Sequence, residues 1–123
     1  MIHFMGLDEH SFDAIAAGEK EYEVRVNDDK QKLVRVGDLI EFTKIPSRDQ
    51  VMTVEVTAIE AFPSFSELKN SIHIEGLDNA NHEGWNSQLH SSYSEEQEAL
   101  MGVLAIQVRP APVLSPVRTI SYS

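Results

Sequence analysis

The sequence of residues 18–25, Gly-Glu-Lys-Glu-Tyr-Glu-Val-Arg, predicts a junction at which a short helix ends and a strand begins. Phe12 and Ile15 recur at helical spacing before this segment, which predicts a helix over residues 8–17. Gly18 is suited to end that helix, because glycine adopts positive φ angles without a steric penalty. Residues 22–26 then alternate as a strand does. The chain therefore reverses direction within a few residues at this point.

Polar side chains gather on one face of the predicted strand. Because successive side chains of a strand point to opposite faces, Glu23 and Arg25 lie side by side and away from the core. Lys20 lies at the turn and can reach over the same face. A carboxylate between two cations suits the binding of a polar ligand. As a plain surface feature, Glu23 and Arg25 would form an exposed ion pair worth at most about 1 kcal/mol, and spacing alone favours that interpretation.

The remaining segments alternate between short strands, helices and turns. Residues 52–59 alternate apolar and polar side chains, as a half-buried strand does. Ser64 with Glu67, and Ser94 with Gln97, have the spacing of helix capping boxes. The prolines after position 109 exclude the tail from a central strand. The other expected elements are a turn at 27–30, two strand segments around a turn at 37–38 within 33–42, a second helix from 63 to 72, a third helix ending near 102, and a strand at 103–108.

Short strands, few helices and frequent turns predict a mainly β fold with short helices (α+β), built on a small β-barrel whose ends the helices cap. A length of 123 residues suits one domain. We expect a single domain over residues 1–109 and a proline-containing tail over residues 110–123. The sequence has no Cys, no apolar run of about 18 residues and no signal-like start, which predicts a cytoplasmic chain without disulfides or a membrane span.

A complete Gly-x-Lys-x-x-Glu-x-Arg signature is formed by Gly18, Lys20, Glu23 and Arg25, and on this motif the chain resembles the ASCH family of PUA-like domains. The resemblance covers roughly residues 3–108. It implies a PUA-like barrel with a cleft, lined by the signature residues, between the barrel and its helices, in a small stand-alone bacterial protein. The flanking segments that resemble the family are Gly37-Asp38 with Phe42, Phe62-Pro63-Ser64-Phe65, Tyr93-Ser94-Glu95-Glu96 and residues 102–106.

The resemblance implies binding of RNA, or of a nucleotide or nucleoside in ordinary or modified form. Arg25 would offer its planar guanidinium to a phosphate or a base edge. Lys20 would supply a mobile charge, and Glu23 would orient Arg25 or accept a proton. The net charge of −10 argues against a broad phosphate-binding surface. Residues 19–35 hold five basic and five acidic side chains, so we expect a compact ligand site instead.

Two other functions fit the same residues. Some ASCH proteins deacetylate acetylated cytidine with a Thr where this chain has Glu23, so their covalent mechanism does not transfer. A hydrolase of a modified nucleoside or RNA would instead use Glu23 or Glu75 to activate water or a ribose hydroxyl, with Lys20 and Arg25 stabilising the negative charge. The acidic composition also allows a regulatory protein-interaction domain.

Two residues outside the signature extend the predicted site. Glu75 follows the second helix and would join Lys20 in proton transfer if the chain is an enzyme; the alternative is a solvated carboxylate at a helix end. Trp85 lies in a long polar segment and would stack on a base, or else anchor that segment to the core. No metal or other cofactor is expected, because the histidines at 73, 82 and 90 lack zinc spacing and no Cys assists them.

Overall fold

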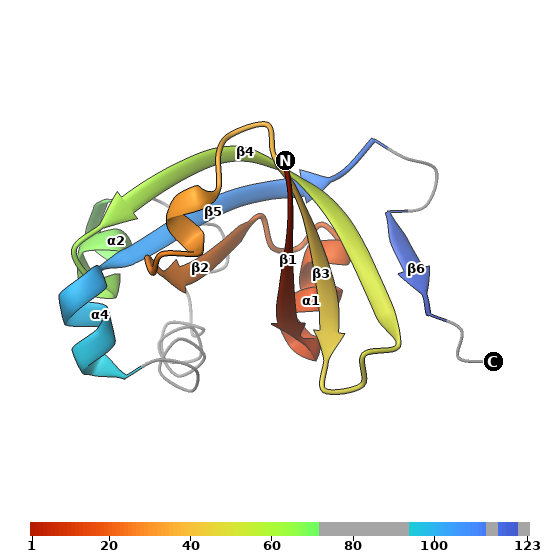
Figure 1. The fold of residues 1–123 in the computed structure, drawn as a ribbon, viewed down its shortest axis with the longest axis horizontal. Coiled ribbons are helices and arrows are strands. Elements are labelled where there is room, and N and C mark those ends of the chain that lie inside the picture. Colours follow the sequence, from red (N-terminus) through yellow and green to blue (C-terminus); the bar gives the residue numbers. More distant parts are fainter. Residues whose placement is uncertain (72–93, 113–115, 121–123) are drawn as a thin grey trace. The chain divides into compact units, whose positions relative to one another are not determined.

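The computed structural model describes residues 1–71, 94–112 and 116–120 (Figure 1). These residues belong to two compact units, each treated by itself below. The first unit contains Met1–Glu21, Arg35–Ala58 and Val108–Ser123, and the second contains Tyr22–Val34 and Ile59–Gln107. The elements in chain order are β1 (Ile2–Asp8), α1 (Glu9–Ala16), β2 (Tyr22–Val26), the 3-10 helix η1 (Gln31–Leu33), β3 (Leu39–Ile45), β4 (Gln50–Phe62), α2 (Phe65–Ser71), α4 (Glu95–Met101), β5 (Val103–Pro110) and β6 (Val117–Thr119).

The fold is mainly β with short helices, as predicted, and it fits the PUA-like class. The strands follow the order β1-β3-β4-β5-β2, and β6 pairs with β4 outside this path. Every helix within the described residues has eight residues or fewer. Since isolated helices of that length are marginal in water, packing against the strands must stabilise them.

In the first unit, β1 runs parallel to β3 and β3 runs antiparallel to β4 (Figure 1). Helix α1 begins after Asp8, whose carboxylate accepts the backbone N–H of Ser11 at 2.9 Å, and it buries Phe12 and Ile15. Strand β1 was not predicted. Its inward residues are buried, but Ile2 and Phe4 on the other face are apolar too. Alternation is invisible in a sequence when both faces of a strand carry apolar residues.

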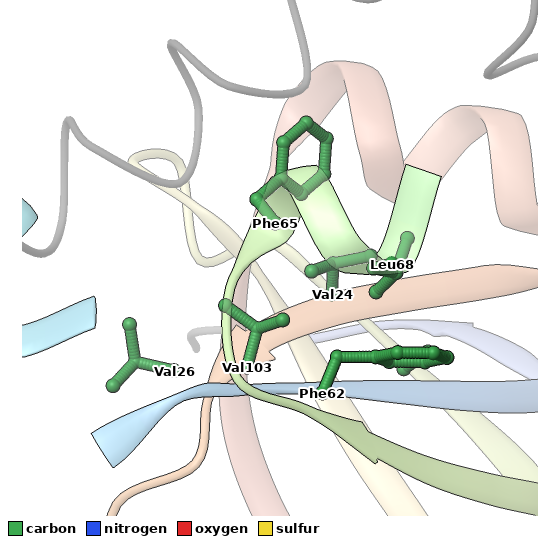
Figure 2. Close-up of a cluster of buried hydrophobic side chains, with 7 residues drawn as sticks. Val24, Val26, Phe62, Phe65, Leu68 and Val103 are labelled. Carbon is green, nitrogen blue, oxygen red and sulfur yellow. The ribbon is translucent and has the colours of Figure 1, made fainter. Parts of the chain in front are cut away.

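In the second unit, β2 pairs antiparallel with β5, and α2 and α4 follow the predicted capping pattern. The Ser64 hydroxyl accepts the backbone N–H of Glu67 in α2, and Ser94 and Gln97 form a complete capping box on α4. Figure 2 shows the apolar cluster to which β2, β4, α2 and β5 all contribute. Its buried members are Val24, Val26, Phe62, Phe65, Leu68, Val103 and Ala105.

One prediction for local structure needs correction. Residues 33–36 are not a strand: Leu33 ends the 3-10 helix η1, Val36 is exposed, and the strand begins only at Leu39. A short run with Leu33, Val34 and Val36 has strand-like composition, but the Asp28 side chain and local backbone bonds hold a tight turn there. The tail was excluded only from a central strand, and part of it forms β6, which lies antiparallel to residues 50–52 of β4 outside the main strand order.

Candidate functional site

Strand β2 carries the second half of the signature on one of its faces. Its register places Glu23 opposite Ile106 and Arg25 opposite Leu104 on β5. Cross-strand partners point to the same side of a sheet, so this face combines two charged side chains with two buried apolar ones. Val24 and Val26 point to the opposite side of the sheet, where they belong to the apolar cluster. The predicted alternation of β2 is therefore confirmed.

Glu23 and Arg25 form a close ion pair. The Oε2 atom of Glu23 accepts a hydrogen bond from Nε of Arg25 at 3.1 Å and lies 3.1 Å from its Nη2 atom. Two nitrogens of one guanidinium thus meet a single carboxylate oxygen. This contact fixes the plane of the guanidinium, which is the geometry needed for directional hydrogen bonds to a ligand.

The pair is more buried than a solvated strand face would be. The side chains of Arg25 and Glu23 are 17% and 8% exposed. Removing two charges from water is costly, and apolar residues of similar volume often stabilise a fold as well or better. Leu104 and Ile106 opposite the pair provide such an apolar environment. The pair therefore lies where buried charges are costly, which makes it a candidate for a ligand site.

Lys20 belongs to the first unit, where it contacts helix α1. After α1 ends, Gly18 adopts a φ of 77°, and the backbone N–H groups of Glu19 and Lys20 both donate to the carbonyl of Ala14. These bonds turn the chain back along the helix. The Nζ atom of Lys20 then donates to Oγ of Ser11 at 2.9 Å. Lys20 is half-buried and Ser11 is almost fully buried, so the lysine is held at a defined position.

The structure thus brings Glu23 together with Arg25 and describes Lys20 with its own unit. Glu75 and Trp85 lie outside the described residues, as do the three histidines considered for zinc. Over the part of the chain that is described, no group of His, Asp or Glu side chains has the arrangement of a metal site. Within those same ranges, no helix is both long enough and apolar enough to cross a membrane. The contact of Ser11 with Lys20 depends on a backbone reversal that residue spacing does not reveal.

Comparisons with a family model and with solved structures agree with one another. A family model described as ASCH domain matches residues 5–112. The crystal structure of the hypothetical protein PH0355 is similar with a TM-score of 0.73 and 31% identity, covering 89% of this chain and 99% of that one. The solution structure of protein PF0455 from Pyrococcus furiosus is similar with a TM-score of 0.67 and 30% identity, covering 92% and 100%. A comparison with curated proteins gave no match.

Proposed function

This chain belongs to the ASCH family, and from that premise we propose that it binds RNA or a nucleotide, with Arg25, Glu23 and Lys20 as ligand-binding residues. ASCH domains are in general similar to RNA-binding domains. The observation that carries the proposal is the buried ion pair on β2. It places a fixed guanidinium and a carboxylate on one strand face that is otherwise apolar.

The pair favours a base edge over a phosphate as the contact of Arg25. Its carboxylate and guanidinium charges sum to zero, so a phosphate approaching Arg25 would also meet the negative charge of Glu23, at 3.1 Å from the same guanidinium. A base edge carries no net charge and presents donors beside acceptors. Such an edge complements a donor and an acceptor held next to each other.

Lys20 is proposed to supply the positive charge that the pair lacks. Its Nζ atom donates to Oγ of Ser11 at 2.9 Å, and this hydrogen bond orients the ammonium group. An oriented ammonium group suits a phosphate or ribose oxygen of the ligand. One phosphate contact of this kind would give RNA binding a shallow dependence on salt, in contrast to the steep dependence of a broad basic surface.

A calorimetric titration of the protein with nucleosides, mononucleotides and short single-stranded RNAs tests the proposal. Saturable binding should weaken at least tenfold in Arg25→Gln, because the variant loses the fixed guanidinium; tenfold corresponds to about 1.4 kcal/mol. Arg48→Gln is the matched control, since Arg48 lies in an exposed turn of the first unit. Trp85→Leu, added to the set, tests the proposed stacking contact, and Glu75→Gln tests the proton-transfer role proposed for an enzyme.

Binding that is the same in wild type and Arg25→Gln would remove Arg25 from the site. Binding of none of these ligands by a folded protein would contradict the function itself. The same preparations should be assayed for turnover of acetylated cytidine and RNA, with and without divalent metal, because turnover lost in Glu23→Gln or Glu75→Gln would favour the hydrolase over a binding module.

A further inference from the structure

The charged face of β2 continues beyond the end of the strand. The β2–β5 register pairs Val26 with Val103, and the next backbone bond, from Asn27 N–H to the Gly102 carbonyl at 3.0 Å, extends the same ladder by one residue. Side chains on one face of a strand recur every two residues. Asn27 therefore follows Glu23 and Arg25 on the same face.

Two buried amide oxygens in this segment have no hydrogen-bond partner among the described residues: Oδ1 of Asn27 and Oε1 of Gln31. Gln31 is only 2% exposed. A buried acceptor without a donor is destabilising, and most such atoms in folded proteins are satisfied. Two of them within five residues, directly after a proposed ligand-binding strand, call for donors that the described residues do not supply.

The backbone around these amides is well supported, so the open oxygens are not a sign of a loose turn. Asp28 accepts the N–H of Gln31 at 2.9 Å on its side chain and the N–H of Lys32 at 3.0 Å on its carbonyl. The carbonyl of Gln31 accepts the N–H of Val34 at 3.1 Å. These main-chain groups of the turn are satisfied, whereas the two amide oxygens have no partner among the described residues.

We infer that Asn27 and Gln31 are ligand-binding residues that accept hydrogen bonds from an amino or hydroxyl group of the bound nucleoside or nucleotide. This inference rests on the proposed function and extends it from the signature to the turn that follows. Arg25 contributes donors and the two amides contribute acceptors. The segment from 23 to 31 then recognises both kinds of polar group on one ligand.

The test compares ligands that differ in the donors they present, each titrated against the full chain. Cytidine with uridine, and adenosine with inosine, replace an exocyclic amine by a carbonyl and turn the adjacent ring nitrogen from an acceptor into an N–H donor. Cytidine with 2′-deoxycytidine removes a ribose hydroxyl. The variants are Gln31→Met and Asn27→Leu, which keep the side-chain volume and remove the acceptor, and Gln31→Glu, which keeps an acceptor oxygen. Thermal unfolding of each free protein is measured alongside.

Wild type is expected to prefer the member that carries the exocyclic amine or the 2′-hydroxyl in at least one pair by tenfold or more. Gln31→Met or Asn27→Leu should reduce that preference to about one, with a melting temperature of the free protein unchanged or raised. The inference is overturned if both variants keep the wild-type preference, if wild type shows no preference, or if the melting temperature falls and both ligands of a pair weaken equally. Arg25→Gln should weaken the binding of both ligands of a pair. If it does not, the proposed function is contradicted rather than this inference. If wild type binds none of the ligands, the proposed function and this inference are both overturned.

Discussion

The backbone N–H of Phe65 donates to Oε1 of Glu98 across 2.8 Å, so helix α4 caps the first turn of helix α2 within the second unit. The two residues are 33 positions apart. Ser64 satisfies a second N–H of the same turn. A helix leaves its first four N–H groups without internal partners, and α2 has only seven residues. The contact with Glu98 therefore helps to hold α2 and the apolar cluster beneath it.

Removal of this cap should be measurable as a loss of stability. Glu98→Ala is expected to lower the free energy of unfolding by about 1 kcal/mol, as the loss of a side-chain helix cap typically does. Urea denaturation followed by circular dichroism checks the value. Glu96→Ala is the control, because Glu96 is an exposed residue of the same helix. Equal stability of the two variants would contradict the role of Glu98.

Gly102 should be far less replaceable than Gly18, although both have positive φ angles. Gly102 has a φ of 74° and a ψ of −171°, a region open almost only to glycine, and an added Cβ would lie 2.6 Å from the carbonyl oxygen of Phe62. Gly18 has a φ of 77° and nothing within 4 Å of an added Cβ. Gly102→Ala should cost about 3 kcal/mol or more, and Gly18→Ala about 1 kcal/mol. Chemical denaturation of both variants measures the two losses in the free energy of unfolding. Similar losses would contradict the close contact between a Cβ atom at position 102 and the Phe62 carbonyl.

Stability should fall on the acid side partly because of Asp38. The hydrogen bond from His3 to its carboxylate, at 2.7 Å, lowers the pKa of Asp38 below its ordinary value of 3.8, helped by the backbone N–H of Arg35 and opposed by burial. A lowered pKa in the folded state gives a contribution that is complete above pH 3.8 and is lost as the pH falls through the lowered value. Asp38→Asn should flatten this part of the acid profile in urea titrations between pH 6 and pH 2, whereas Asp29→Asn, in an exposed turn, should leave it unchanged.

Lys44 should produce the opposite dependence at high pH. Its Nζ lies 3.0 Å from Oδ1 of Asp13, and this hydrogen bond raises the pKa of Lys44 above its ordinary value of 10.5. The resulting contribution is complete below pH 10.5 and is lost as the pH rises through the raised value. Lys44→Arg should retain the contact and show a shallower alkaline loss, since guanidinium stays protonated. Thermal unfolding between pH 8 and pH 12 tests this, and identical profiles for the two proteins would contradict it.

Local signals in the sequence predicted much of the fold. Capping residues and the turn glycine set the helix ends, and the alternation of residues 52–59 predicted the central part of β4, where Met52, Val54 and Val56 are buried. Strand β1 could not be recognised, because Ile2 and Phe4 give its exposed face an apolar composition. The pairing of β6 with β4 depends on contacts distant in the sequence, which local patterns do not contain.

For the site, spacing predicted that Glu23 and Arg25 are neighbours, which the structure confirms. It did not predict their burial, because burial depends on β5, which lies some eighty residues later in the sequence. Asn27 was interpreted only as a turn residue, and Gln31 was not singled out. Polar residues recur every second position at Glu23, Arg25 and Asn27, and this pattern could have indicated Asn27. The predicted strand ended at Val26, so the pattern was not followed that far.

The most direct test of the account is calorimetric titration of wild type and Arg25→Gln with the same nucleosides, nucleotides and short RNAs, with Arg48→Gln as control. The account predicts saturable binding by wild type and the control, and affinity at least tenfold weaker in Arg25→Gln, with the fold retained by circular dichroism. Equal affinity in all three proteins, or no binding by folded wild type, would contradict it.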